Sequence, residues 1–344
     1  LPYDHLYWEV FAEDEAGNES SWSEEWEFEL KEPKITDIWW EDPKGTRLSD
    51  GATRNAGENI YIAVETEYMR GSDATIYRYE EDPADDDFIE AKKISVPDDS
   101  DTGRKKWTVD WHPDGLSDFP EYKLWRSKGY FEGVHSPLLN VSEDEPPSKP
   151  GEIELADDTG RSGSDGITSI DSPTFTWSEA SDQYSGIEKY EYRVDSGSWQ
   201  GNSDSTEVTL SEQSDAGHKF YVRAVDVADN TGSHSSISFK IDGKNPQSVS
   251  GLTNPKNPTK DKKPNVSWDC TTGTGSTIWK YEIVFDDGDW DFDFGSGDHT
   301  YISKDGDCKL NDAEFSEPLE EDEWSWWVRA WDVAGNRSDW AGGP

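Results

Sequence analysis

Hydrophobic and polar side chains alternate with a period of two along much of this chain, which is the pattern of β-strands whose two faces meet different surroundings. The clearest alternation lies in an eleven-residue phrase that occurs three times with little change. In its second copy, Phe220, Val222 and Ala224 fall on one face of the predicted strand, and an Asp and a final Asn follow. We expect this strand to end in a tight turn. The copies occupy residues 8–18, 220–230 and 326–336.

The spacing of the phrase indicates repeated modules. Asp332 lies 106 residues after Asp226 (332 − 226), and Asp226 lies 212 residues after Asp14 (226 − 14), which is twice 106. A repeat of about 100 residues suits a β-sandwich. We therefore predict an all-β chain of tandem sandwiches that form a rod. The predicted segments are the C-terminal part of a module at 1–31, a divergent sandwich at 33–142, and two similar sandwiches at 147–242 and 243–344.

Residues 1–31 hold one copy of the phrase and one further strand, at residues 25–30. Two strands alone are marginally stable in water. We therefore expect this hairpin to pair with an upstream part of a longer protein or with a strand from another molecule. The linkers between the predicted segments are short and mostly carry proline, which favours semi-rigid joints.

The composition is strongly acidic and rich in aromatic residues. With 75 acidic and 32 basic residues, the net charge is −43 (32 − 75). Such a field repels phosphate backbones and anionic lipid head groups, so nucleic acid and membrane surfaces are poor partners, whereas divalent cations are attracted. A high-salt habitat would also explain the acidity. The 18 Trp, 14 Tyr and 12 Phe residues argue against disorder, because large rings fill the cores of small sandwiches. No run of about 18 apolar residues occurs, so we predict no membrane insertion of this segment.

The two cysteines and four sequons are candidates for covalent modification. Cys270 and Cys308 both lie in the last segment, which fits one disulfide in an oxidising compartment; two free thiols are the alternative. Two of the four Asn-x-Ser/Thr sequons lie on the turn of the repeated phrase, where we expect exposure. The candidate glycosylation sites are Asn18, Asn140, Asn265 and Asn336.

A family resemblance rests on residues 177–199 and on the phrase that follows them. Trp177, the Ser185-Gly186-Ile187 run and the alternating Tyr190 and Tyr192 precede the second copy of the phrase. Together they resemble the Ig-like and fibronectin type III-like repeats of large bacterial and archaeal surface proteins. The resemblance covers 147–242 and 243–344 well, 1–31 partly and 33–142 weakly. It implies Ig-like sandwiches, an extracellular location and a stalk-like or adhesive role, and it identifies no ligand.

The aspartates of the phrase have two readings. Asp14, Asp226 and Asp332 each continue the inward-facing positions of a predicted strand to its end. Each could simply cap its own turn by accepting backbone N–H bonds. The more specific hypothesis is a calcium-binding site, because two loops and a linker would bring hard oxygen ligands to the same end of an Ig-like sandwich. The candidate ligands there are Asp226, Asp229 and Asn230 of one loop, Glu179 and Asp182 of another, and Glu143, Asp144 and Glu145 of the linker. Asp332 with Asp242 and Asp269 could repeat the site one segment later.

A further acidic run lies in the last segment, where aspartates alternate with aromatic residues. We interpret this run as a strand edge with its rings inward and its carboxylates outward. A calcium loop of the EF-hand type would need Gly after Asp293, and Phe294 stands there. The aspartates of this run are Asp287, Asp289, Asp291 and Asp293.

No enzyme signature is present. The six His residues give no zinc spacing, and there is no P-loop and no nucleophile elbow, so we expect no catalytic activity. Outward-facing aromatic rings are the remaining candidates for recognition. Trp327 and Trp331 fall on the outward register of their strand, and one of Trp39 and Trp40 must face away from its core. Such rings stack on sugars or lie at protein contacts, and we favour the protein contact.

The sequence therefore predicts an extracellular structural protein whose Ig-like modules form a filament subunit, a surface-layer component or an adhesin stalk. Its partners would be copies of itself or other surface proteins, with glycans as further candidates. Ca²⁺ is the one cofactor that the residues suggest. The alternative function is a carbohydrate-binding accessory region of a secreted enzyme.

Overall fold

A computed structural model gives the architecture of the chain, and every regular element in the part that it describes is a β-strand. The chain divides into two compact units, residues 1–145 with 183–186 and residues 146–182 with 187–344. Among the described residues, no helix is long and apolar enough to cross a membrane. The described residues are 5–80, 87–111, 120–126, 133–255, 259–286, 299–303, 306–310, 315, 317–320 and 322–343.

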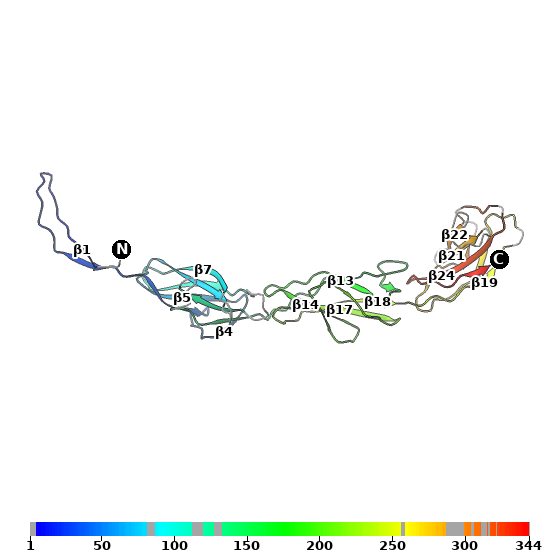
Figure 1. Ribbon diagram of the computed structural model, residues 1–344, viewed down its shortest axis with the longest axis horizontal. Helices are drawn as coiled ribbons and strands as arrows, with labels where there is room; N and C mark the ends of the chain where they lie inside the picture. The colour runs from blue at the N-terminus through cyan, green and yellow to red at the C-terminus, as the bar shows by residue number, and fades with distance from the viewer. Residues whose placement is uncertain are drawn as a thin grey trace. The chain divides into compact units, whose positions relative to one another are not determined.

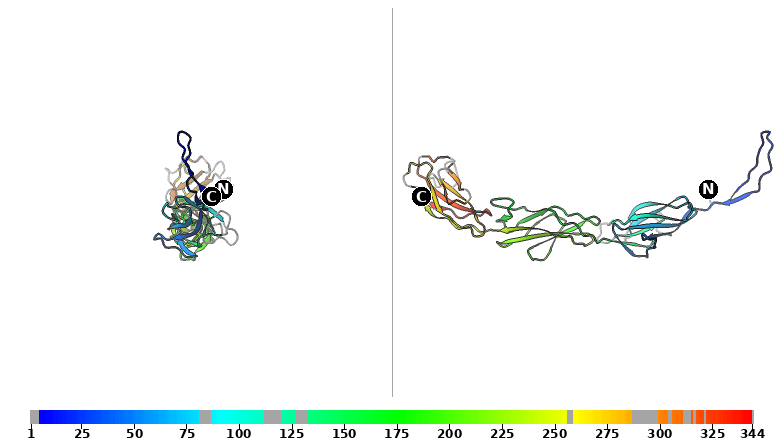
Figure 2. Two further views of the ribbon diagram at one scale, coloured as in Figure 1. Left: turned by 90° about the vertical axis from the view of Figure 1, so that its left-hand side faces the viewer. Right: turned by 180° about the vertical axis from the view of Figure 1, so that it is seen from behind.

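The first unit begins with a two-stranded hairpin. Strand β1 (His5–Trp8) pairs antiparallel with β2 (Trp26–Glu29), and Trp8 lies opposite Trp26. Figures 1 and 2 show the two strands joined by a long open loop. Within the described residues these strands pair only with each other, and large apolar side chains remain exposed. These are Tyr7, Trp8, Val10, Phe11, Trp22, Trp26, Phe28 and Leu30.

Residues 33–142 form two sheets of three and five strands. The core between them is apolar, and Trp107 of one sheet packs edge-on against Tyr122 of the other, with ring centroids 5.7 Å apart. The first sheet has the order β3 (Lys34–Glu41), β5 (Asn59–Glu67), β8 (Thr102–Thr108). The second has the order β4 (Ala52–Asn55), β10 (Leu139–Ser142), β9 (Glu121–Trp125), β6 (Asp73–Glu80), β7 (Asp87–Ser95).

A buried arginine distinguishes this domain from the ones that follow. The Arg78 guanidinium lies 4.5 Å from the ring centroid of Trp107 and 4.7 Å from that of Tyr122. Asp110 and Glu90 form ion pairs with it, so the charge is compensated although Arg78 is only 1% exposed. The alternation of hydrophobic positions did not indicate this residue.

Residues 147–242 form the next pair of sheets, as the repeated phrase predicts. Phe220, Val222 and Ala224 are fully buried on one face of β17 (Gly217–Asp226), and Phe175 of the facing sheet stacks on Phe220 with ring centroids 4.3 Å apart. The smaller sheet has the order β11 (Ile153–Leu155), β13 (Thr174–Trp177), β16 (Glu207–Thr209). The larger has the order β12 (Ile167–Thr168), β18 (Ser235–Ile241), β17, β14 (Ile187–Val194), β15 (Gln200–Asn202).

Residues 243–344 repeat this arrangement. Tyr190 of β14 pairs with Ala224 of β17, and Tyr281 of β21 pairs with Ala330 of β24 in the same register. Cys270 and Cys308 form a disulfide in this structure, with the two Cα atoms 5.3 Å apart. One sheet is β19 (Ser250–Thr253), β20 (Val266–Asp269), β23 (Lys309–Leu310). The other is β22 (His299–Ser303), β21 (Ile278–Asp286), β24 (Ser325–Asp332), β25 (Ala341–Gly343). The acidic run from Asp287 to Asp293 lies outside the described residues.

Candidate metal site

Asp226 ends β17 and turns the chain back on itself. Its carboxylate Oδ1 accepts the backbone N–H of Asn230 at 2.7 Å, and its own carbonyl oxygen accepts the N–H of Asp229 at 3.2 Å. Asp229 has a φ of 64°, in the left-handed region that short polar side chains tolerate. The capping role that the sequence suggested is therefore observed.

The same turn occurs at Asp14, Asp42 and Asp332. In each, Oδ1 accepts the N–H of the residue four positions on, at 2.9 Å, 2.8 Å and 2.9 Å in that order. The copy at Asp42 was missed from the sequence because the strand before it lacks the repeated phrase. The spacing of Asp42 and Gly45, which matches that of Asp332 and Gly335, could have revealed it.

The second carboxylate oxygen separates Asp226 from its counterparts. In the other two copies of the phrase, Oδ2 accepts the side-chain amide of the Asn four residues later, at 2.9 Å for Asp14 and 3.0 Å for Asp332. Asp226 Oδ2 is buried and has no hydrogen-bond partner. A buried carboxylate oxygen without a partner is costly, so this atom is a candidate ligand for a bound cation.

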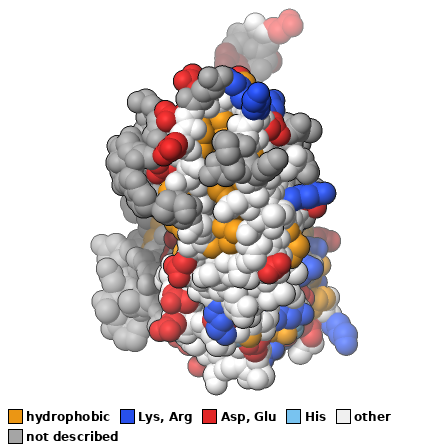
Figure 3. All heavy atoms as spheres, turned by 90° about the vertical axis from the view of Figure 1, so that its right-hand side faces the viewer, with side chains coloured by type: hydrophobic (Ala, Val, Ile, Leu, Met, Phe, Trp, Pro, Cys, Tyr) orange, Lys and Arg blue, Asp and Glu red, His pale blue; other side chains and the backbone are white. Residues whose placement is uncertain are grey.

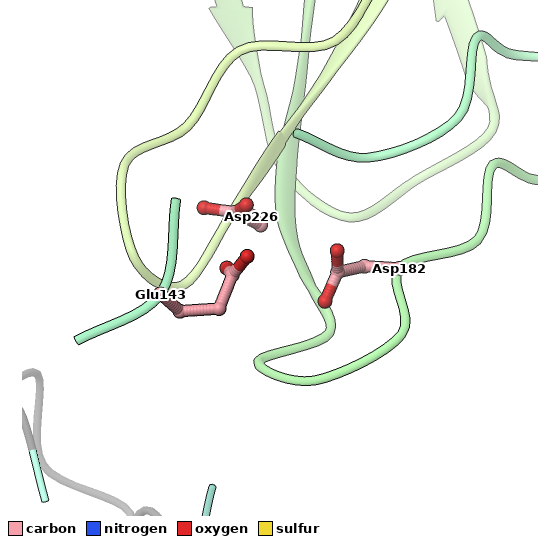
Figure 4. Close-up of side chains that lie close together, drawn as sticks. All are labelled: Glu143, Asp182 and Asp226. Atoms are coloured by element: carbon pink, nitrogen blue, oxygen red, sulfur yellow. The ribbon is translucent and has the colours of Figure 1, made fainter. Parts of the chain in front are cut away.

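Two further carboxylates lie beside Asp226. One oxygen each of Glu143, Asp182 and Asp226 lies within 4.8 Å of the other two. Figure 4 shows the three carboxylates close together, on three separate segments of the chain. Glu143 is 5% exposed and Asp226 is fully buried, whereas Asp182 is half-buried. Ser185 Oγ donates to Glu143 Oε2 at 3.1 Å, which ties the linker to this loop.

The size and chemistry of this cluster fit a calcium ion. Ca²⁺ binds oxygen ligands at roughly 2.4 Å, so two ligands on opposite sides are separated by about 4.8 Å. The three carboxylate oxygens therefore lie close enough together to contact one ion. Without a cation, three negative charges would face each other in a largely buried place, which is unfavourable.

Not every predicted ligand joins this cluster. Asp182 and Asp226 do, together with Glu143 of the predicted linker. The remaining acidic candidates around this joint are exposed at the surface, where water solvates their charge. These are Asp144, Glu145, Glu179 and Asp229.

The predicted second site has two buried carboxylates. Asp242 and Asp332 are fully buried, and the Asn336 side-chain amide donates to Asp332 Oδ2 at 3.0 Å and to the Asp242 carbonyl oxygen at 2.6 Å. Burial raises the pKa of Asp332, and the nearby charge of Asp242 raises it further. Asp269, the third predicted ligand, is exposed. Within the described residues, no third acidic, His or Cys side chain completes a group of three at this place.

A glycine explains the missing ligand. The two domains align at an offset of 91 in this region, so Asp182 corresponds to Gly273 (182 + 91) and Ser185 to Ser276 (185 + 91). A Cβ on Gly273 would lie 1.7 Å from the Ser276 carbonyl oxygen, which leaves no space for a side chain. Asp242 Oδ2 and Ser276 Oγ are both buried without a hydrogen-bond partner, so this pocket is polar but has fewer ligands.

The candidate tryptophans are less available than the sequence suggested. Trp327 lies on the outward register but is only 8% exposed. The Trp331 ring has Lys280 Nζ 4.3 Å and the Arg337 guanidinium 4.0 Å from its centroid, and its Nε1–H donates to Glu282. Cations already cover this ring, which opposes sugar stacking.

Trp39 is the outward-facing member of its pair, since Trp40 is fully buried. The choice that the sequence left open between these two rings is therefore settled.

The four sequons differ in exposure. Asn18 and Asn265 are exposed, whereas Asn140 and Asn336 are half-buried. Glycosylation at Asn336 would compete with the two hydrogen bonds of its amide. On the face drawn in Figure 3, acidic and basic side chains lie scattered among uncharged atoms.

Comparisons with known proteins agree with the fold. Residues 146–243 match the bacterial Ig-like domain. The chain thus carries Ig-like β-sandwich repeats, a kind of domain that is typical of surface proteins and is usually non-catalytic. No curated protein matches the sequence.

Two solved structures are similar over part of the chain. Fibronectin(III)-like modules of CbhA from Clostridium thermocellum share 16% identity over 59% of this chain and 93% of theirs, with a TM-score of 0.23. The Spr0440 glycoside hydrolase domain, Endo-D, from Streptococcus pneumoniae R6 shares 13% identity over 62% of this chain and 38% of its own, with a TM-score of 0.24.

Proposed function

We propose that this chain is a structural part of an extracellular surface protein, a stalk or filament component whose Ig-like domains act as spacers, and that Ca²⁺ binds Glu143, Asp182 and Asp226. The match of residues 146–243 to the bacterial Ig-like domain supports the structural role. The acidity of the chain supports retention of divalent cations at its surface.

The ion would be bound by three separate segments of the chain. Glu143 comes directly after β10, whereas Asp182 belongs to a loop and Asp226 ends β17. A cation bound to all three would join these segments through metal–oxygen bonds and remove the repulsion between their charges. Fixing the linker in this way would suit a protein that must carry load or hold a binding domain away from a cell.

One observation carries the calcium proposal: Asp226 Oδ2 is buried, lacks a hydrogen-bond partner and lies beside two other carboxylates. In the other two copies of the repeated phrase the equivalent oxygen accepts a side-chain amide N–H. The turn at Asp226 thus has the same cap as the other copies, while its Oδ2 has no hydrogen-bond partner.

Differential scanning calorimetry of the whole chain tests this proposal. Unfolding is recorded in a chelator, in CaCl₂ and in MgCl₂, for the natural sequence and for Asp226→Asn. We expect calcium to raise the Tm of the natural chain, magnesium to do so less because it requires a tighter octahedral shell, and Asp226→Asn to abolish the rise. Asp14→Asn, in the exposed copy of the turn, is the matched control and should keep it.

An unchanged Tm on adding calcium to the natural chain would contradict the calcium site. An equal rise in the Asp226→Asn variant would place calcium elsewhere on the acidic surface. Either result would leave the spacer role untouched, because that role rests on the Ig-like domains.

Copies of this chain or other surface proteins are the partners that we propose. The hairpin of β1 and β2 supports this, since the equivalent apolar positions of β17 are buried between two sheets. Sedimentation velocity over a range of concentrations tests self-association, and Trp26→Ser should weaken it. A monomer at all concentrations would exclude copies of the chain as partners.

A further inference from the structure

A strained tyrosine marks a separate place in the first unit. Tyr68 directly follows β5 and has a φ of 60°, in the left-handed region that bulky side chains rarely adopt. Its side chain is 58% exposed, so burial does not hold it there. Among the described residues, the other two non-glycine residues with positive φ are Asp195 and Asp229, whose short side chains tolerate this conformation. Such outliers cluster at functional sites.

Tyr68 lines a pocket of about 550 Å³. This volume lies within the usual range for small-molecule sites, which combine an apolar or aromatic wall with a few fixed polar groups. Tyr68 is the aromatic residue of the lining. The other lining residues are Thr66, Glu67, Arg70 and Asp101.

The polar wall of the pocket is held in place. Arg70 Nε donates to Asp101 Oδ1 at 2.8 Å, and a second bond joins the other guanidinium nitrogen to Oδ2 at 2.5 Å. The carbonyl oxygen of Asp101 accepts both the backbone N–H and the hydroxyl of Thr66, at 2.8 Å and 2.9 Å. The side chains of Arg70 and Asp101 remain 55% and 45% exposed, so their remaining donors and acceptors are open to a ligand.

Each charged side chain that lines the pocket has a partner of opposite charge. Arg70 is paired with Asp101, and Glu67 is paired at 2.8 Å with Lys34, which lies outside the lining. The chain as a whole carries a net charge of −43. Because the charges of the lining are already paired, the pocket offers little to a free ion, and it suits an uncharged ligand that is rich in hydroxyl groups.

We propose that this pocket binds a neutral saccharide. One face of a pyranose ring presents C–H groups, which can lie against the Tyr68 ring, while its hydroxyl groups can both donate to Asp101 and accept from Arg70. Such binding would give the spacer a contact surface of its own. It depends neither on calcium nor on Trp327 and Trp331.

A printed array of neutral and acidic oligosaccharides, followed by saturation-transfer NMR with the neutral ones that bind, tests the proposal on the whole chain. Tyr68→Gly should weaken binding by about tenfold. It should not lower the Tm, because Gly adopts this φ without strain, so loss of binding could not be ascribed to unfolding. Tyr68→Phe keeps the ring and should keep binding.

Tyr7→Ala is the matched control, because Tyr7 lies in the same unit and is 57% exposed, and it should leave binding unchanged. The proposal is overturned if no neutral oligosaccharide binds, if acidic ones bind better, or if Tyr68→Gly binds as well as the natural chain. Loss of self-association in Tyr68→Gly without any saccharide binding would also overturn it and would make the pocket a protein contact.

Discussion

Two copies of one turn, at Asp226 and at Asp332, have the same backbone and different surroundings. Both aspartates are fully buried and both cap the turn through Oδ1. At Asp332 the second oxygen accepts the Asn336 amide, which also binds the carbonyl of Asp242. At Asp226 the second oxygen lacks a hydrogen-bond partner and lies beside Glu143 and Asp182.

This difference shows how one repeat can make two kinds of joint. Around Asp332 the protein closes the joint with its own groups, including Lys240 Nζ, which donates to the Gly275 carbonyl at 2.8 Å. Thr159 Oγ1 also donates to the Ala334 carbonyl at 2.7 Å. Around Asp226 three carboxylates gather, and in the function proposed above a cation holds them together. We therefore expect the first joint to depend on calcium and the second to be independent of it.

The largest effect expected is that of Asp226→Asn on stability, which should change sign between a chelator and calcium. In a chelator, Asp226→Asn should stabilise the chain, because the amide oxygen still caps the turn while one of three repelling charges is removed. In calcium at about 100 times its Kd, the natural chain should gain about 2.7 kcal/mol that the variant lacks. Calorimetry in both buffers measures this difference. Asp332→Asn should not change the calcium response, and a loss of response in that variant would reverse the assignment of the two joints.

The next effect concerns the closed packing of the second joint. A Cβ on Gly275 would lie 2.1 Å from Asp242 Oδ1, so Gly275→Ala should destabilise the second unit by about 1–3 kcal/mol. Gly201→Ala is the control, since nothing lies within 4 Å of its Cβ position. Urea unfolding of both variants gives the two free energies. If Gly275→Ala is as stable as Gly201→Ala, the pocket around Asp242 has room for an added side chain.

A smaller effect is expected from the amide that joins the two aspartates. Asn336→Ala removes bonds to Asp332 and to the Asp242 carbonyl, and it should lower the free energy of unfolding by about 1–2 kcal/mol. Asn18→Ala removes the same bond in the exposed hairpin and should cost much less. If the two substitutions cost the same in urea titrations, the Asn336 amide does not stabilise the joint.

The smallest effect expected is on the dependence of stability on pH. Burial raises the pKa of Asp332, and the repulsion from Asp242 adds to this, so the folded chain holds this proton more tightly than the unfolded chain does. The resulting stabilisation is fully present below the ordinary pKa of 3.8 and is lost as the pH rises through the higher folded pKa. The Tm of the natural chain should therefore fall relative to Asp332→Asn over that range. If the difference in Tm between the natural chain and Asp332→Asn does not change with pH, the ionisation of Asp332 does not contribute to the dependence of stability on pH.

The fold could be predicted because the repeated phrase determines both the strand and its turn. Alternation placed Phe220, Val222 and Ala224 in the core, and the register of Tyr190 with Ala224 recurs at Tyr281 with Ala330. The two cysteines could be paired because they lay in one domain.

The site was only partly predictable, because its geometry depends on loops and on packing between distant segments. The sequence brought Asp182, Asp226 and the linker together, but it could not tell Glu143 from Asp144, since only the structure shows which of them is buried. It also did not reveal that Gly273 takes the place of a ligand in the second joint. Trp327 shows a related limit, because the outward register of a strand does not ensure exposure.

A crystal structure of the chain grown with calcium, with anomalous difference maps, tests the central claim most directly. The account predicts one calcium ion bound by an oxygen each of Glu143, Asp182 and Asp226 at about 2.4 Å, and no ion between Asp242 and Asp332. An empty first site in saturating calcium, or an ion bound only at the second pair, would contradict it.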